Sequence, residues 1–203
     1  MPPLKKLNYL NGVVICHGKS ELCIAKFITT NLHLRIKVFA KEKGGSSIQI
    51  PGLMKVLNTK PFDKPTSFIE QYSDVEFSGR GKKTKLSNFK LFIIMDTDDC
   101  TDKQKEDFIS GAMFAEHWLS EYIVPIYSIK SVEDVMIDVG LMKERIPDNE
   151  KGKFYTKVFP INPKPLSNDT LQEVKTLREK VEKSRKTNLI AFIDYCLKLL
   201  PAK

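Results

Sequence analysis

FKLFIIMD, residues 89–96, is the segment that decides the fold class. Its apolar run is nearly continuous, which is typical of a strand in a parallel sheet that helices cover on both faces. The acidic sequence DTDDCTD, residues 96–102, begins at the last residue of this run. Asp96 and Asp98 are therefore expected at the carboxyl end of the strand, where ligand-binding groups collect in open α/β sheets.

Strand and helix patterns alternate around this segment. Short β-rich runs lie at residues 12–16, 34–40 and 123–129, and helical apolar spacing lies at 20–32, 44–58, 102–122 and 132–140. Thr101 and Gln104 form a capping-box pattern for the third of these helices, and Gly140 can end the fourth. The alternation predicts an α/β fold with a Rossmann-like, mostly parallel sheet and helices on both faces.

The chain divides into two parts by composition. Residues 1–140 are expected to form the α/β domain, and within it residues 60–88, rich in Pro, Ser, Gly and Lys, are predicted to be an insertion or a mobile loop. Residues 141–203 are expected to be a basic loop followed by C-terminal helices at 168–186 and 188–200. These helices have three alternative roles: covering the sheet edge, forming a homodimer, or docking a partner such as an ATPase.

The composition is that of an ordinary globular protein, with 41% hydrophobic and 29% charged residues. No apolar run approaches the length that spans a membrane, and the amino terminus lacks the pattern of a secretory signal. The four cysteines form no CxxC pair, so their spacing fits neither a zinc site nor a disulfide framework. Reduced thiols in the cytoplasm are the expectation.

The net charge of +8 is unevenly distributed along the chain. Residues 141–203 carry 14 Lys and Arg against 8 Asp and Glu, whereas residues 1–140 carry 19 against 17. A second basic cluster is RGKKTK, residues 80–85. Basic flanks beside a balanced domain suit a polyanion such as DNA or RNA. Solvated surface lysines that bind nothing give the same pattern.

VVICHGKSE, residues 13–21, contains a Gly-Lys-Ser sequence of the kind that ends a P-loop. Gly12 and Gly18 are separated by five residues rather than four, and those five residues are the strand itself. In a P-loop the strand precedes the first glycine, and the loop between the glycines surrounds the phosphates. The segment is therefore a strand, a His-Gly turn and a helix that carries Glu21 in its first turn.

The acidic residues after the strand at 89–96 indicate a metal site. Carboxylates that gather at a buried strand end repel one another, and burying them is costly unless a cation is bound. Mg²⁺ favours sites with a few carboxylates, water and substrate phosphates. For Asp99 and Asp102 a simpler reading stays open, because acids at a helix N-terminus also interact favourably with the helix dipole.

These two motifs resemble those of the Toprim domain, the metal-dependent fold of topoisomerases, DnaG-type primases and OLD-family nucleases. The family pattern is a strand ending in Glu-Gly, a helix, and a later strand ending in Asp-x-Asp. Here VVICHGKSE takes the first position and FIIMDTD the second. The OLD-like and RloB-like branch reads Glu-Gly-x-x-Glu at the first motif, and YSIKSVEDV, residues 127–135, resembles its segment with a further acid. The resemblance covers about residues 10–140.

The resemblance implies a nuclease that hydrolyses phosphodiesters with Mg²⁺ or Mn²⁺ and acts in defence against, or by, phages and other mobile elements. It places Glu21, Asp96, Asp98 and Glu133, with Asp134 as a further candidate, at the metal. Catalysis would involve His17, Glu21, Asp96, Asp98 and a lysine that stabilises developing charge, with Lys19, Lys151 and Lys153 as candidates. The residues expected to contact nucleic acid are Arg80, Lys82, Lys83, Lys85, Lys151 and Lys153.

His17 departs from the family pattern, which has glutamate at this position. A neutral imidazole can bind metal or act as a general base. Alternatively, His17 marks a degenerate module that binds nucleic acid or a protein partner without cutting, or it is an inactivating substitution. His33 and His117 have no comparable setting and are expected to be structural.

Two other fold families fit the sequence less well. A receiver-like signalling domain would use Asp96 as a phosphoacceptor, but it needs an acidic pair where this chain has Cys16 and His17. A flavodoxin-like domain needs a first turn rich in glycine and hydroxyl residues, which the segment after residue 16 does not provide.

Overall fold

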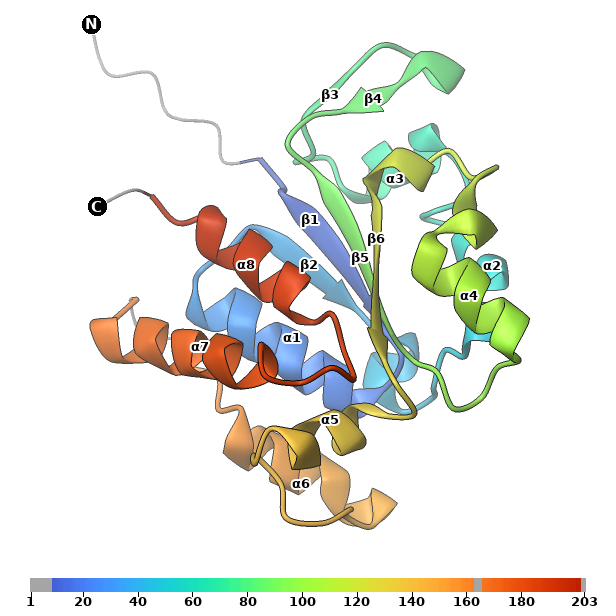
Figure 1. Cartoon of the computed structure of the whole chain (residues 1–203). Coiled ribbons are helices and arrows are strands. Elements are labelled where there is room, and N and C mark those ends of the chain that lie inside the picture. Colours follow the sequence, from blue (N-terminus) through green and yellow to red (C-terminus); the bar gives the residue numbers. More distant parts are fainter. Residues whose placement is uncertain (1–8, 163–165, 202–203) are drawn as a thin grey trace, which may run out of the picture.

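A computed structural model describes residues 9–162 and 166–201 of the 203-residue chain. Its centre is a four-stranded parallel sheet in the order β2-β1-β5-β6 (Figure 1). The strands are β1 (Gly12–Cys16), β2 (Ile36–Phe39), β5 (Lys90–Asp96) and β6 (Ile123–Ser128). The predicted α/β fold, with its parallel sheet and its C-terminal helices, is confirmed.

The register of the strands aligns their carboxyl ends at one edge of the sheet. Cys16, the last residue of β1, pairs with Ile94 of β5, and Asp96, the last residue of β5, pairs with Ser128 of β6. Side chains that follow β1, β5 and β6 are therefore brought together at this edge.

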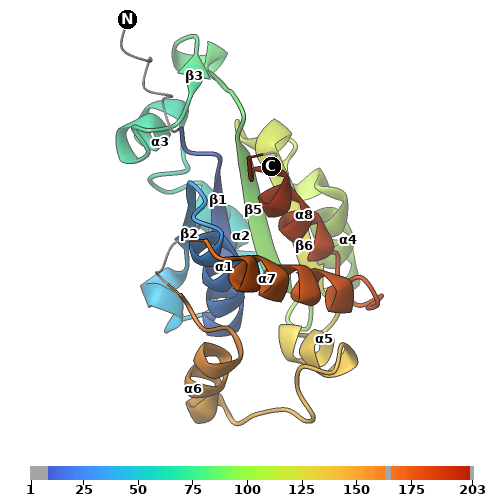
Figure 2. The same ribbon diagram turned by 90° about the vertical axis from the view of Figure 1, so that its left-hand side faces the viewer.

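Helices cover both faces of the sheet, as Figure 1 shows. One face carries α1 (Lys19–Asn31), α7 (Asn168–Val181) and α8 (Ile190–Lys198), and the other carries α2 (Ile50–Leu57), α3 (Pro65–Gln71) and α4 (Asp102–Ser110). Two further helices, α5 (Val132–Asp138) and α6 (Asp148–Val158), lie at the carboxyl-end edge (Figures 1 and 2). Short 3-10 turns are η1 (Lys41–Gly44), η2 (Gly81–Lys83), η3 (Ala112–Phe114) and η4 (Ser120–Tyr122).

Two hydrophobic clusters form the core, one on each face of the sheet. Alternate side chains of a strand point to opposite faces, so Val14 and Phe92 pack in one cluster and Val13 and Leu91 in the other. The first cluster also holds buried side chains of α6, α7 and α8. The basic C-terminal third is thus packed into the same core as the sheet.

The segment 60–88, predicted to be an insertion or a mobile loop, contains α3 and a two-stranded antiparallel ribbon. The ribbon, here called the β3–β4 hairpin, pairs β3 (Phe77–Ser78) with β4 (Lys85–Leu86). Phe62, Phe68 and Tyr72 are buried against one another, with ring centroids 4.7–6.5 Å apart. This aromatic packing anchors the start of the segment to the sheet.

Two predicted elements differ from the structure. The capping box of Thr101 and Gln104 forms, but the helix ends at Ser110, because Gly111 adopts a left-handed φ of 80° and closes it. Residues 141–166, expected to be a loop, contain α6. Tyr155 of this helix and Phe159, its C-cap residue, lie four residues apart and pack together in the first cluster. Within the part of the chain that the structure describes, no helix is both long enough and apolar enough to cross a membrane.

Candidate functional site

Three carboxylates from three different elements meet at the carboxyl-end edge of the sheet. Glu21 lies in the first turn of α1, Asp96 is the last residue of β5, and Glu133 lies in the first turn of α5. Their side chains are buried, with exposed fractions of 2%, 6% and 6%. The negative charges of Glu21 and Glu133 both act on Asp96. The structure therefore brings together three of the four predicted metal ligands.

Local hydrogen bonds hold each carboxylate in place. The backbone N–H of Gly18 donates to Glu21 Oε2 at 2.9 Å, and the N–H of Val132 donates to Asp96 Oδ1 at 2.9 Å. The Ser20 hydroxyl donates to Glu133 Oε1 at 3.1 Å. Backbone amides at the starts of α1 and α5 thus orient two of the carboxylates.

Burial and mutual repulsion favour the protonated forms of Asp96 and Glu21. Burial is the main cause that raises the pKa of Asp96 to about 10, and the charges of Glu21, Glu133 and Asp98 add to it. Burial also raises the pKa of Glu21; His17 opposes this rise and Glu133 adds to it. A cation bound among these groups would remove the repulsion and restore the ionised forms.

His17 follows β1 directly and lies beside the acids. Its N–H donates to the carbonyl of Ile94 at 2.9 Å, and its carbonyl accepts from the N–H of Ile48 at 2.8 Å. Its side chain is half-buried, and the buried Nδ1 has no hydrogen-bond partner among the described residues. His17 is close enough to Glu21 and Asp99 to influence both pKa values. Two backbone hydrogen bonds therefore hold His17 in place, and its side chain lies near Glu21 and Asp99.

The other acids of the two motifs lie outside the buried group. Asp98 is exposed and acts on Asp96 only through its charge. Asp134 forms an ion pair with Arg145 at 2.7 Å. Burial acts to raise the pKa of Asp134, but hydrogen bonds from Arg145 and Ser131 outweigh this effect and lower the pKa. Asp102 is exposed in the first turn of α4, as the helix-dipole interpretation predicts.

One predicted lysine enters the site. Lys151 of α6 places its Nζ 3.4 Å from Glu133 Oε1 and is about one-third exposed. Lys19, exposed in the first turn of α1, and Lys153 line a groove beside the site. Thus the helix that sequence patterns did not predict supplies a lysine that pairs with Glu133.

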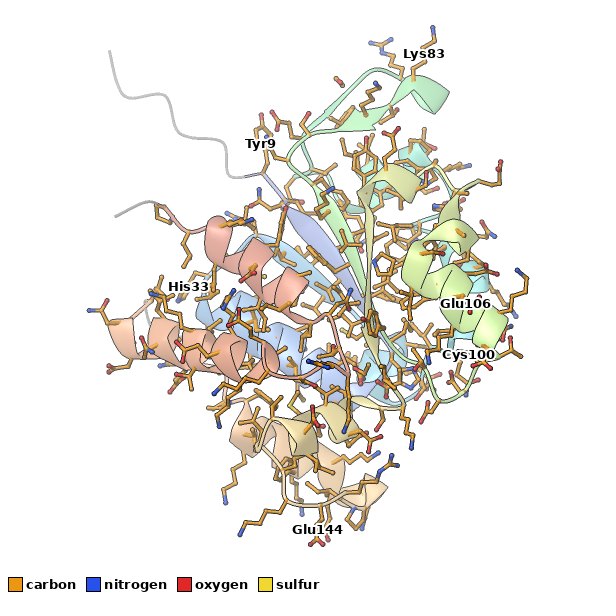
Figure 3. All side chains as sticks on the ribbon, in the orientation of Figure 1. Tyr9, His33, Lys83, Cys100, Glu106 and Glu144 are labelled. Atoms are coloured by element: carbon orange, nitrogen blue, oxygen red, sulfur yellow. The ribbon has the colours of Figure 1, made fainter. Side chains whose placement is uncertain are left out.

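The predicted nucleic-acid contacts in RGKKTK lie elsewhere. Arg80, Lys83 and Lys85 belong to the β3–β4 hairpin, at the end of the molecule opposite α5 and α6 (Figures 1 and 2). Figure 3 labels Lys83 at the hairpin and Glu144, just before α6, at the other end. The seven residues of β5 alone span about 20 Å between these ends. The side chain of Lys82 lies outside the described residues.

Ser20 and Tyr155 were not predicted as site residues, and for Asp99 the sequence left a metal role and a helix-dipole role open. Ser20 hydrogen-bonds to Glu133. Tyr155 of α6 is fully buried, and its pKa is raised first by burial and then by the charges of Glu133 and Glu21. Asp99 faces His17; burial raises its pKa, and its buried Oδ1 has no hydrogen-bond partner among the described residues. The family pattern gave no signal for Ser20, which occupies an unspecified position of Glu-Gly-x-x-Glu, and none for Tyr155.

The residue types suit a hard divalent cation, but the side chains are not arranged around one. Carboxylate oxygens are the ligands that Mg²⁺ prefers, and buried polar atoms without partners, such as His17 Nδ1 and Asp99 Oδ1, are typical of sites that take up water or an ion. Among the described residues, however, no group of three or more His, Cys, Asp and Glu side chains is positioned to hold a metal. Each buried carboxylate instead binds donors of the protein itself.

Comparisons with known proteins give no relative. The chain matches no protein-family model, and neither a curated protein nor a solved structure is significantly similar to it. The function is therefore inferred from the site and from the two sequence motifs.

Proposed function

We propose that this protein is a metal-dependent nuclease of the Toprim type, which hydrolyses phosphodiester bonds of DNA or RNA. The observation that carries the proposal is the convergence of Glu21, Asp96 and Glu133 from α1, β5 and α5 at one edge of a parallel sheet. Burial of three acids is costly, and a bound cation would offset that cost. A role in defence against, or by, phages and other mobile elements rests on the resemblance alone.

Glu21, Asp96 and Glu133 would hold Mg²⁺ or Mn²⁺, with Asp98 at the exposed rim. When bound, such an ion polarises the scissile phosphate and activates water. The residues of the chain orient the site: Gly18 and Val132 fix two carboxylates through their N–H groups. Lys151, which pairs with Glu133, is placed to neutralise charge that develops on the phosphate. The unpartnered Nδ1 of His17 can accept a proton from water.

The alternative is a degenerate module that binds nucleic acid or a protein partner without cutting. Two observations favour it: His17 stands where the family has glutamate, and no group of three ligands is arranged for a metal within residues 9–162 and 166–201. In that case Lys151 is the permanent counter-charge of Glu133. Both functions fit a cytoplasmic protein with free thiols, which the four unpaired cysteines support.

Cleavage of labelled single- and double-stranded DNA and RNA, with Mg²⁺ or Mn²⁺, separates these functions. The proteins to compare are the wild type, His17→Glu and Asp96→Asn. Asn at position 96 keeps an oxygen that can accept from the Val132 N–H, so the fold is retained, but it cannot ionise to bind a cation. We expect the wild type to cleave and Asp96→Asn to be inactive.

Cleavage by His17→Glu alone would mean that the carboxylates form a nuclease site which His17 keeps inactive, and the natural chain would then be the degenerate module. If none of the three proteins cleaves any substrate, while the wild type still binds nucleic acid, the nuclease proposal is wrong.

A further inference from the structure

An open groove of about 650 Å³ runs between the first turn of α1 and one side of α6. We call it the α1–α6 groove, and its lining residues are Lys19, Asn149, Gly152, Lys153, Thr156 and Lys157. Three of these six are lysines, and the other three are small or uncharged. The groove is thus an open, cationic depression, which is a surface suited to an extended anion.

Gly152 sets the depth of this groove. It lies in the interior of α6, where glycine destabilises a helix by about 1 kcal/mol relative to alanine. Packing does not require it, because a Cβ at this position would meet only Lys19 Cε, at an ordinary 4.0 Å. The absence of a side chain leaves the helix backbone accessible from the groove.

The groove opens beside the buried carboxylates. Ser20, the residue after Lys19 on α1, donates to Glu133 Oε1 at 3.1 Å, and Lys151 is the residue before Gly152 on α6. Lys151 reaches Glu133 at 3.4 Å from the same helix. A chain of anions that lies along Lys157, Lys153 and Lys19 would therefore arrive beside Glu133.

We propose that the α1–α6 groove binds the sugar–phosphate backbone of a single nucleic-acid strand and leads it to the carboxylates; this inference rests on the proposed nuclease function. Lysines contact phosphates as point charges, without reading sequence. The six lining residues include no aromatic ring on which a base could stack, so the contacts are with the backbone. Duplex DNA is stiff, whereas a single strand can bend toward acids that are at most 6% exposed.

Binding of a fluorescein-labelled single-stranded oligothymidine, followed by fluorescence anisotropy in EDTA, tests this inference without cleavage. The groove variant is Lys153→Glu/Lys157→Glu. The matched control is Lys55→Glu/Lys64→Glu, which makes the same charge change at exposed positions of α2 and the start of α3, on the opposite face of the sheet. A third variant, Gly152→Leu, fills the groove without changing charge and improves helix propensity.

We expect the groove variant to bind weakly and the control to bind like the wild type. Each phosphate contact contributes about 0.7 to the slope of log K against log salt for single strands, so the groove variant should lower that slope by about 1.4. Gly152→Leu should bind weakly although its melting temperature is unchanged or higher. An equal-length duplex should bind less tightly than the single strand.

Three results would overturn the inference. Equal weakening of the groove variant and the control would show that net charge alone controls binding. Full binding by the groove variant, with loss in Lys83→Glu/Lys85→Glu, would place the contact at the β3–β4 hairpin. Duplex binding as tight as single-strand binding would refute the single-strand specificity. Because EDTA prevents metal-dependent cleavage, this assay measures binding alone. A protein that binds through the groove here, but cleaves no substrate in the separate assay with Mg²⁺ or Mn²⁺, contradicts only the nuclease proposal.

Discussion

Asp96 is the residue on which the site depends most, and its raised pKa lowers the stability of the fold at neutral pH. Its folded pKa is about 10, against an ordinary value of 3.8. An acid whose folded pKa is raised contributes full stability below its unfolded pKa, and that stability is lost as the pH rises toward the folded pKa. Between pH 3.8 and about 10, unfolding is therefore favoured by ionisation of Asp96 in the unfolded chain.

The variant Asp96→Asn should accordingly be more stable than the wild type in EDTA at neutral pH. Each pKa unit corresponds to about 1.4 kcal/mol, so the difference in the free energy of unfolding should reach up to about 4 kcal/mol at pH 7 and vanish near pH 4. Urea denaturation at several pH values measures it. Parallel curves for the two proteins from pH 4 to pH 8 would show that Asp96 is ionised in the fold at no cost.

At the scale of elements, the start of α5 positions Glu133. Ser131 caps this helix by accepting the N–H of Asp134 at 3.4 Å, and Glu133 lies in the turn that the cap closes. Ser131→Ala should cost about 1 kcal/mol of stability and also weaken Mn²⁺ binding, because the first turn frays. Ser167→Ala is the control, since Ser167 caps α7 in the same way. It should cost about the same stability and leave Mn²⁺ binding unchanged; an equal effect of both variants on Mn²⁺ binding would contradict the role of α5.

The elements that sequence patterns predicted are those whose signal is local. The strand β5 has a continuous apolar run, and α4 has a capping box. The helix α6 was missed because its charged residues and Gly152 hide the spacing of its apolar ones. Its packing is long-range: Phe159 contacts Phe27 of α1 with ring centroids 5.5 Å apart.

The same distinction applies to the site. The strand-end rule predicted Asp96, because parallel strands bring their carboxyl ends to one edge. The family resemblance predicted Glu21 from the first motif and Glu133 from the segment YSIKSVEDV. Asp99 lies in the turn after β5, and Tyr155 lies in α6. No local sequence pattern predicts where these two segments lie relative to the carboxylates. For the same reason, the sequence could not show that RGKKTK lies at the far end of the sheet from the acids.

At the scale of the whole molecule, the C-terminal helices and the sheet form one packed unit. Phe192 of α8 is fully buried, with its ring centroid 5.0 Å from that of Phe92 in β5. The Tyr195 hydroxyl donates to the carbonyl of Asn11 at 2.7 Å, across 184 residues of sequence. These contacts join the last helix to β5 and to Asn11, the residue before β1.

Phe192→Ala should therefore destabilise the entire fold by about 3–5 kcal/mol. The chain has a single tryptophan, Trp118, which packs on the opposite face of the sheet and reports unfolding there by fluorescence. In Phe192→Ala we expect the urea midpoint measured by Trp118 fluorescence to fall together with the midpoint measured by far-ultraviolet circular dichroism. Phe77→Ala, at a side chain that is 45% exposed, should change the stability by less than about 0.5 kcal/mol. An unchanged Trp118 midpoint in Phe192→Ala would mean that the two faces unfold independently.

The most direct test of the proposed site is a calorimetric titration of the purified protein with Mn²⁺. We expect binding by the wild type, a loss of affinity of more than about tenfold in both Glu21→Gln and Asp96→Asn, and tighter binding by His17→Glu, which adds a carboxylate. Binding that these substitutions leave unchanged, or no Mn²⁺ binding by either the wild type or His17→Glu, would show that the buried carboxylates are not a metal centre.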